Sequence, residues 1–233
     1  MKLGIVGGIG PESTIDYYRM FIKEYQSIVK DGSYPELTIN CIDMSKMLGM
    51  VGRQDWQGLV DYLYFSVAQL VNAGATYALL ASNTPHVVFE ELQDRCNIPL
   101  LSIVEETCKK TKSIGINKIG LLGTGFTMKS DYYQKVFERE GLSIFVPSEE
   151  EQEYIHNKIF SELQSLIITD ETKTGLLSIV KRMLGDHGVE GVILGCTELP
   201  LILTEDEFGL RFINTSQVHI ESAIKYGLSG SVR

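Results

Sequence analysis

A repeat of about half the chain length constrains the fold more than any other feature of this sequence. Residues 2–8 form an apolar, glycine-rich run that is followed by the tripeptide Asp16-Tyr17-Tyr18. The same pattern recurs at residues 118–124, followed by Asp131-Tyr132-Tyr133. The two copies stand about 115 positions apart in a chain of 233 residues. A shared offset of this size predicts two similar domains.

A second pair of apolar runs supports the repeat, because residues 78–81 lead into Ser82 and residues 192–195 lead into Cys196 at nearly the same offset. Short β-rich runs alternate with longer segments of helical spacing along the chain, which is typical of βαβ units. The expected strands are residues 3–6, 37–42, 77–81, 100–103, 119–122, 143–146, 191–195 and 211–213. The expected helices are residues 13–29, 57–71, 85–92, 129–140, 149–166, 176–184 and 217–226.

We therefore expect an α/β protein with two pseudo-symmetric domains, each a mainly parallel sheet flanked by helices. The first would comprise residues 1–98 plus 214–233, and the second residues 99–213. Ligands of parallel α/β sheets bind beyond the carboxyl ends of the strands, where Ser82 and Cys196 are both expected. The active site is accordingly expected in the cleft between the domains. Two proton-transfer groups on opposite faces of one carbon are what inversion at a stereocentre requires.

The charge balance argues against several classes of partner. The chain has 30 acidic and 21 basic residues, a net charge of −9, and no stretch rich in Lys and Arg. Nucleic-acid binding normally uses a basic patch. The first apolar run is broken by glycines and by Glu12, which fits neither a signal peptide nor a membrane span. We expect a cytoplasmic protein without nucleic-acid or membrane partners.

The cysteines and histidines form no recognisable metal motif. The four cysteines contain no CxxC pair, and the four histidines no HExxH cluster. We expect no metal site. In a reducing compartment Cys41, Cys96 and Cys108 are expected to be packed as small apolar side chains, with Cys41 in a buried strand. Cys196 is the expected exception.

The loop at residues 7–13 contains a broken dinucleotide fingerprint. Gly8-Ile9-Gly10 begins a GxGxxG motif, but Ser13 stands where the last glycine is required. Pro11 is expected at the first helical position. Amides near a helix N-terminus can hold a carboxylate, so the loop favours an anion site over NAD binding. The structural alternative is a simple turn from strand to helix.

The turn that begins at Ser82 has two interpretations. In the structural one, Thr84 is the N-cap of a helix whose first residue is Pro85. In the functional one, Asn83 and Thr84 present an amide and a hydroxyl to a ligand.

The segment Gly195-Cys196-Thr197-Glu198 gives stronger evidence. A cysteine at the end of a buried strand, before a helical turn, faces N–H groups that lower the pKa of a thiol. Thr197 and Glu198 can bind a substrate or set the proton balance of the thiol. The alternative is a buried structural cysteine. The correspondence between Cys196 and Ser82 favours catalysis.

These motifs resemble those of the aspartate/glutamate racemase family nearly end to end, at residues 7–14, 82–86, 98–107, 120–124 and 195–198. The resemblance implies two pseudo-symmetric α/β domains and racemisation of an amino acid without pyridoxal phosphate or any other cofactor. It implies catalytic roles at Cys196 and Ser82. It also implies substrate-binding roles at Asn83, Thr84, Thr124 and Thr197, and we expect Ile9, Pro85 and Glu198 to line the same site. We expect a homodimer.

The chain departs from the family pattern at Ser82, because the two-thiol members have a cysteine there. A thiol with a pKa near 8.5 yields some thiolate at neutral pH, whereas a serine hydroxyl needs an activating base. Ser82 is therefore expected to return a proton rather than to remove one, and the resemblance to L-specific members implies faster turnover from L to D. Aspartate-specific members hold the side-chain carboxylate with cations, and the candidates here, Lys46, Arg53 and Lys158, are expected to be solvated surface charges.

The leading hypothesis is a racemase for an acidic amino acid, aspartate or glutamate, with proton abstraction by Cys196 and reprotonation on the Ser82 side. One alternative keeps the fold and makes Cys196 the proton donor of a single-thiol malonate-type decarboxylase. Another is a catalytically inactive amino-acid-binding protein.

Overall fold

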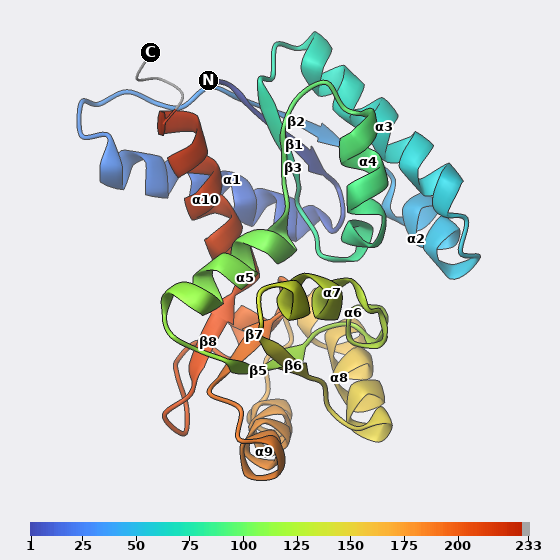
Figure 1. Ribbon diagram of the computed structural model, residues 1–233, viewed down its shortest axis with the longest axis vertical. Coiled ribbons are helices and arrows are strands. Elements are labelled where there is room, and N and C mark those ends of the chain that lie inside the picture. The colour runs from blue at the N-terminus through green and yellow to red at the C-terminus, as the bar shows by residue number, and fades with distance from the viewer. Residues whose placement is uncertain (230–233) are drawn as a thin grey trace. The chain divides into compact units, whose positions relative to one another are not determined.

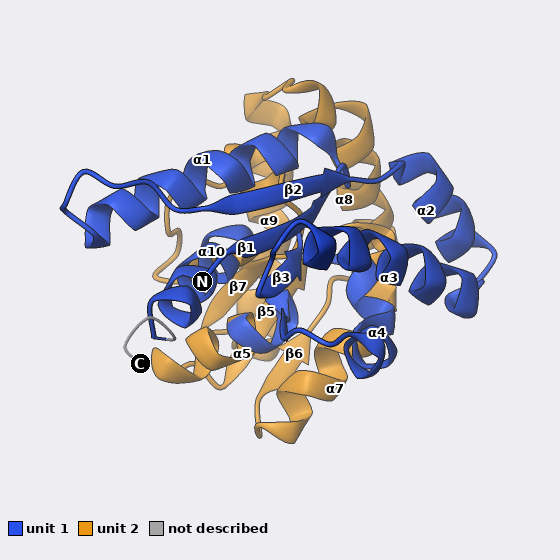
Figure 2. Cartoon of the chain, turned by 90° about the horizontal axis from the view of Figure 1, so that it is seen from above, with its two compact units in different colours: residues 1–106, 216–233 blue, residues 107–215 orange. Residues whose placement is uncertain are grey.

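The computed structural model describes residues 1–229, and these divide into two compact units (Figures 1 and 2). Unit 1 comprises Met1–Glu106 and the chain from Ser216 onward, and unit 2 comprises Thr107–Thr215. Helix α5 (Ile103–Ser113) carries the chain from unit 1 into unit 2, and helix α10 (Thr215–Ser229) carries it back.

Each unit is built on a parallel sheet, and within the described residues each sheet has four strands. The order in unit 1 is β2-β1-β3-β4, with β1 at Leu3–Gly7, β2 at Leu37–Cys41, β3 at Tyr77–Leu80 and β4 at Leu100–Leu101. The order in unit 2 is β6-β5-β7-β8, with β5 at Lys118–Leu122, β6 at Ser143–Phe145, β7 at Gly191–Leu194 and β8 at Arg211–Asn214. The two sheets use the same strand order, so the fold predicted from the repeat is confirmed.

Helices connect the strands in both units. Unit 1 contains α1 (Pro11–Ile28), α2 (Met44–Gly52), α3 (Trp56–Asn72), the 3₁₀ helix η1 (Thr84–Val88) and α4 (Phe89–Arg95). Unit 2 contains α6 (Gly125–Lys129), α7 (Tyr132–Arg139), α8 (Glu149–Ser161), η2 (Leu163–Ser165), α9 (Asp170–His187) and η3 (Leu199–Leu201).

Local capping explains where the structure differs from the expected elements. The strand expected at residues 100–103 ends at Leu101, because the Glu105 N–H donates to Ser102 Oγ at 3.3 Å and α5 begins at once. Helix α2 was not expected, although the Asp43 carboxylate accepts from the N–H groups of Ser45 and Lys46 at its start. The helix expected at residues 129–140 is the shorter α7, which begins at Tyr132, and the separate helix α6, which was not expected, ends at Lys129.

Each of the two units contains a hydrophobic core. In unit 1, Leu3 and Ile5 of β1 pack with Tyr17 of α1 and Ile220 of α10, so these two helices cover one face of the sheet. In unit 2, side chains of β5 and β7 pack with α8 and α9. Burial of each large apolar side chain contributes about 1.5–3 kcal/mol to stability. Each core thereby fixes the strand ends that carry the candidate site.

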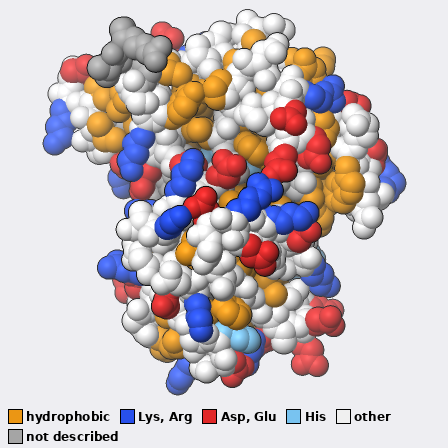
Figure 3. Space-filling view, viewed as in Figure 1, with side chains coloured by type: hydrophobic (Ala, Val, Ile, Leu, Met, Phe, Trp, Pro, Cys, Tyr) orange, Lys and Arg blue, Asp and Glu red, His pale blue; other side chains and the backbone are white. Residues whose placement is uncertain are grey.

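Two further observations concern the surface charges and the apolar character of the helices. On the face shown in Figure 3, acidic and basic side chains are interspersed. Among residues 1–229, no helix combines the length and the apolar character that crossing a membrane requires.

Candidate active site

The candidate residues lie at equivalent strand ends of the two sheets. In unit 1 the register pairs Val6 with Leu80, and the Ala81 N–H then donates to the Val6 carbonyl at 2.9 Å. In unit 2 the register pairs Leu122 with Leu194, and the Gly195 N–H donates to the Leu122 carbonyl at 2.7 Å. Ser82 and Cys196 each follow directly. Each therefore lies beside the loop that follows the neighbouring strand of its own sheet.

The loop after β1 is held closely by Thr14. The Gly8 N–H donates to Thr14 Oγ1 at 2.8 Å, and this hydroxyl donates to the Gly10 carbonyl at 3.0 Å. A Cβ on Gly7 would lie 2.5 Å from Thr14 Cγ2, and Gly8 has a φ of +81°. These contacts require glycine at both positions. Pro11 stands at the start of α1 as predicted.

The turn after β3 does not use Thr84 as an N-cap. The N-cap of η1 is Asn83, and its side chain makes no capping hydrogen bond. The structural interpretation of this turn is therefore wrong in its details, because the chain forms a 3₁₀ helix that begins at Thr84 itself. Ser82 and Thr84 are half-buried, while Asn83 and Pro85 are buried.

The Cys196 thiol is paired with a carboxylate. Cys196 Sγ donates to Glu198 Oε2 at 2.8 Å, and Thr197 Oγ1 donates to the same oxygen at 2.9 Å. Burial raises the pKa of the Cys196 thiol well above its ordinary value, and the charge of Glu198 raises it further. The expected low thiol pKa is thus wrong for this state, because the N–H groups of Thr197 and Glu198 are outweighed. The thiol proton already points at an acceptor.

Comparison with known proteins decides the family. The model of the family described as Asp/Glu/hydantoin racemase matches residues 6–223. The chain belongs to this family. A proposed Asp/Glu racemase from Yersinia pestis has 30% identity and a TM-score of 0.91, covering 97% of this chain and 99% of that one.

Two further relatives are similar over nearly their whole length. An aspartate racemase homologue from Pyrococcus horikoshii has 33% identity and a TM-score of 0.87, covering 97% of this chain and 99% of that one. A broad-specificity amino-acid racemase from Bacillus subtilis is 26% identical over 235 residues, which cover 95% of this chain and 96% of the relative.

Tyr132 is a further residue near the candidate site that the sequence of this family member did not predict. Its hydroxyl is buried, and the nearby Thr127 side chain acts on it as a weak hydrogen-bond partner that lowers its pKa. Burial raises its pKa, and the charge of Cys196 acts in the same direction, so the two side chains interact. Tyr132 marks the repeat in the sequence, but nothing there indicated that its hydroxyl lies near the thiol.

Thr124 occupies the equivalent of the glycine loop in unit 2. Its Oγ1 accepts a hydrogen bond from the Thr127 N–H at 3.3 Å and caps α6. The next amide, at Gly125, donates to His156 Nδ1 at 3.2 Å. Thr124 is half-buried, and its hydroxyl has a structural role as the N-cap of α6.

The three candidate cations differ in exposure and in their contacts. Lys46 and Arg53 are exposed as expected, and Lys46 Nζ lies 4.4 Å from the centre of the Tyr62 ring. Lys158 is not a solvated charge, because it forms an ion pair with Glu162 that raises the pKa of Lys158. The partner Glu162 also accepts from Thr172 Oγ1, so Lys158 belongs to the packing of α8 on α9.

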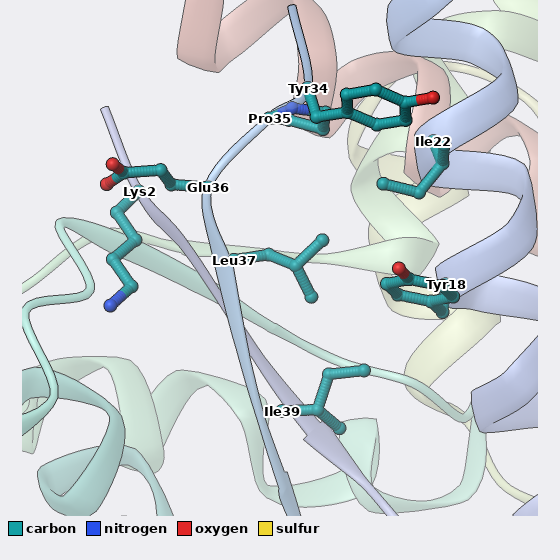
Figure 4. A pocket seen from close by; sticks show the side chains of 8 residues that line it. All are labelled: Lys2, Tyr18, Ile22, Tyr34, Pro35, Glu36, Leu37 and Ile39. Atoms are coloured by element: carbon teal, nitrogen blue, oxygen red, sulfur yellow. The ribbon is translucent and has the colours of Figure 1, made fainter.

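An exposed thiol and a surface groove are two further features of unit 1. Cys41 is exposed rather than buried, because β2 is the edge strand of its sheet. A groove of about 620 Å³ between α1 and β2 has Tyr18, Tyr34 and Leu37 in its lining (Figure 4). Its lining contains neither Ser82 nor Cys196, and within residues 1–229 no cluster of potential metal ligands is found.

Two buried histidines make the stability of unit 1 sensitive to pH. Burial, with the charge of His219 adding to it, lowers the pKa of His86 to about 3, and burial lowers the pKa of His219 to about 4. The unfolded chain binds these protons below about pH 6.5. Their contribution to stability is therefore complete above that pH and is lost as the pH falls toward the folded pKa values.

We expect the His219→Gln variant to be less sensitive to acid than the wild type. Glutamine can still donate to the Leu101 carbonyl, which His219 Nε2 contacts at 2.9 Å, but it does not titrate. Between near pH 7 and near pH 5, the wild type should lose about 2 kcal/mol more of its unfolding free energy than the variant. Urea unfolding at both pH values measures this difference, and equal losses would contradict it.

Proposed function

We propose that this protein is an amino-acid racemase that uses no cofactor and acts on an acidic amino acid, aspartate or glutamate. The observation that carries the proposal is the thiol–carboxylate pair of Cys196 and Glu198 at the strand end equivalent to Ser82. Family membership and the similarity to a broad-specificity amino-acid racemase support it. The similarity to an aspartate racemase homologue supports an acidic substrate.

In the proposed mechanism, the Cys196 thiol first passes its proton to the Glu198 carboxylate along their hydrogen bond. The thiolate then removes the α-proton of the L-enantiomer, and the electron pair of the C–H bond remains on Cα. Ser82, or a water held by its hydroxyl, returns a proton to the opposite face and regains one from solvent. The thiol keeps the abstracted proton, and Glu198 finally releases the proton that it received to solvent. This one proton balances the one that Ser82 regains.

The neighbouring polar groups would bind and stabilise the substrate. We assign the substrate's amino and carboxylate groups to Asn83, Thr84, Thr124 and Thr197, with Ile9 and Pro85 as apolar lining. Hydrogen-bond donors at a carboxylate stabilise the charge that develops as the carbanion forms.

A panel assay tests the function. The protein is incubated separately with the L- and D-forms of aspartate, glutamate and a broad set of other amino acids, and chirality is followed by chiral chromatography. We expect both enantiomers of an acidic amino acid to approach equal amounts, since free enantiomers have an equilibrium constant of one. Binding measured by calorimetry without any inversion, across the whole panel, would contradict racemisation and leave an amino-acid-binding protein.

The Ser82→Cys variant is expected to turn over the D-enantiomer faster. A thiol at this position can act as a base, and a positioned base contributes about 10²- to 10⁴-fold, so we expect kcat from D to rise by about tenfold or more. The value of kcat from L should change less, while kcat/KM stays equal in both directions because the equilibrium constant is one. Ser82→Ala is the matched control and should slow racemisation. Unchanged kcat values in both variants would exclude Ser82 from the reaction.

The assembly and location belong to the same proposal. We propose a cytoplasmic location, in keeping with the acidic composition and the widely spaced cysteines, and we propose a homodimer as the assembly. Light scattering of the purified protein would test the dimer.

A further inference from the structure

A buried chain of polar rings lies behind the Ser82 turn in unit 1. The His86 and His219 rings approach edge to face with centroids 6.1 Å apart, and Phe89 stacks on His86 at 5.1 Å. His219 in turn contacts Tyr17 of α1, with His219 Nδ1 at 3.1 Å from the Tyr17 hydroxyl. The chain thereby connects α1, α10 and the η1 turn that follows Ser82.

The hydrogen bonds assign the proton on each ring. His219 Nε2 lies 2.9 Å from the Leu101 carbonyl, which can only accept, so Nε2 carries the proton and Nδ1 accepts from Tyr17. His86 Nε2 accepts from the Ile103 N–H at 3.1 Å. Burial keeps the His86 ring neutral, so its proton must be on Nδ1.

The Nδ1–H of His86 is a buried donor whose geometry in this structure falls short of a full hydrogen bond. The backbone carbonyls of Ser82 and Asn83 are the acceptors near this ring, and their weak hydrogen bonding raises the pKa of His86 against the larger effect of burial. An unsatisfied buried donor costs free energy, and a small movement of the turn toward the ring would recover it. A ligand bound by Asn83 and Thr84 would contact this same turn and could move it.

We propose that His86 is a positioning residue, whose Nδ1–H bonds to the Ser82 or Asn83 carbonyl when the amino acid binds and so fixes the Ser82 hydroxyl for reprotonation. This inference rests on the proposed function. The Nε2 bond to Ile103 anchors the ring on the first residue of α5, so the ring can hold the turn without moving itself. His86 would contact no substrate atom.

Two conservative variants separate the two ring nitrogens. In His86→Gln the side-chain oxygen can take the place of Nε2 and accept from Ile103, but no donor remains at the position of Nδ1. In His86→Asn the amide nitrogen takes the place of Nδ1, but the acceptor for Ile103 is lost. Phe89→Leu serves as the control, because it removes the stacked ring and leaves both nitrogens.

The readout is the amount of deuterium in recovered L-substrate for each inversion in D₂O. In His86→Gln the carbanion should persist longer, so that the Cys196 thiol exchanges its abstracted proton with D₂O and returns a deuteron to the same face. This ratio should therefore rise by about tenfold while the melting temperature stays near that of the wild type. In His86→Asn the ratio should stay near that of the wild type while the melting temperature falls. Phe89→Leu should keep the wild-type ratio. A wild-type ratio in His86→Gln, or the same increase in both His86 variants, would overturn the inference.

A measurement on the wild-type protein tests the inference even if the variants fail to fold. In ¹⁵N NMR of the wild type, the His86 Nδ1–H proton should shift downfield when L-aspartate or L-glutamate binds, whether or not turnover occurs. A bound complex with an unshifted Nδ1–H would overturn the inference. A wild type that binds the amino acid with this shift but never inverts it would instead contradict only the proposed function.

Discussion

Replacing Cys196 by alanine is expected to reduce α-proton exchange from both enantiomers by about 10²- to 10⁴-fold, the usual contribution of a positioned acid–base group. Alanine leaves no atom that can take the α-proton of the L-enantiomer, or return one to it, and a serine hydroxyl such as that of Ser82 is a poor base unless another group activates it. The measurement is the initial rate of deuterium incorporation at Cα for each enantiomer.

The matched control is Cys41→Ala, which removes an exposed thiol at the end of β2. This control should keep the rate of the wild type. Exchange that survives in Cys196→Ala at the wild-type rate would show that the thiol takes no part. Circular dichroism should report the same fold for both variants.

Replacing Glu198 by glutamine is expected to slow turnover near neutral pH by about 10²-fold, because the thiol loses its proton acceptor. The substitution also has a second effect, on the pKa of the thiol, which favours activity. The charge of Glu198 and its accepted hydrogen bond both raise the pKa of Cys196, so this pKa should be lower in the variant. Activity should therefore recover as the pH rises toward the lowered thiol pKa.

Two measurements check the Glu198 prediction together. The pH dependence of kcat follows the recovery of activity, and the rate of iodoacetamide labelling of Cys196 against pH follows thiolate formation. Thr197→Val is the control for the labelling measurement alone, because Thr197 is assigned to the substrate. It removes the other hydrogen bond to Glu198 Oε2 and keeps the charge, so the labelling of Cys196 should keep the pH dependence of the wild type. A glutamine variant with the wild-type activity and the wild-type thiol titration would contradict the assigned role.

The fold and the candidate strand ends were predictable because they depend on local patterns. Apolar runs and the common offset placed Ser82 and Cys196 after equivalent strands, and the sheets then repeat the same order. The start of α5 was also readable, because Ser102 and Glu105 have the spacing of a capping box. The apolar run at residues 100–103 predicts a strand that overlaps this signal, and the cap at Ser102 ends the strand at Leu101.

The electrostatics of the site depend on tertiary structure and were not predictable. Favourable N–H groups predicted a low thiol pKa at Cys196, whereas burial and the conformation of Glu198 raise it. The ion pair of Lys158 with Glu162 likewise required the packing of α8. The exposure of Cys41 follows from the edge position of β2, which sequence periodicity does not reveal.

The most direct test of proton transfer on two faces is the position of deuterium early in the reaction. L-aspartate or L-glutamate, whichever the panel identifies, is converted in D₂O to a small extent, and both enantiomers are recovered for mass spectrometry. If Cys196 removes the proton and the Ser82 side returns another, the D-product carries one deuterium at Cα while the recovered L-substrate contains much less deuterium than the product. Equal deuterium in both enantiomers, or inversion without any deuterium, would contradict this mechanism.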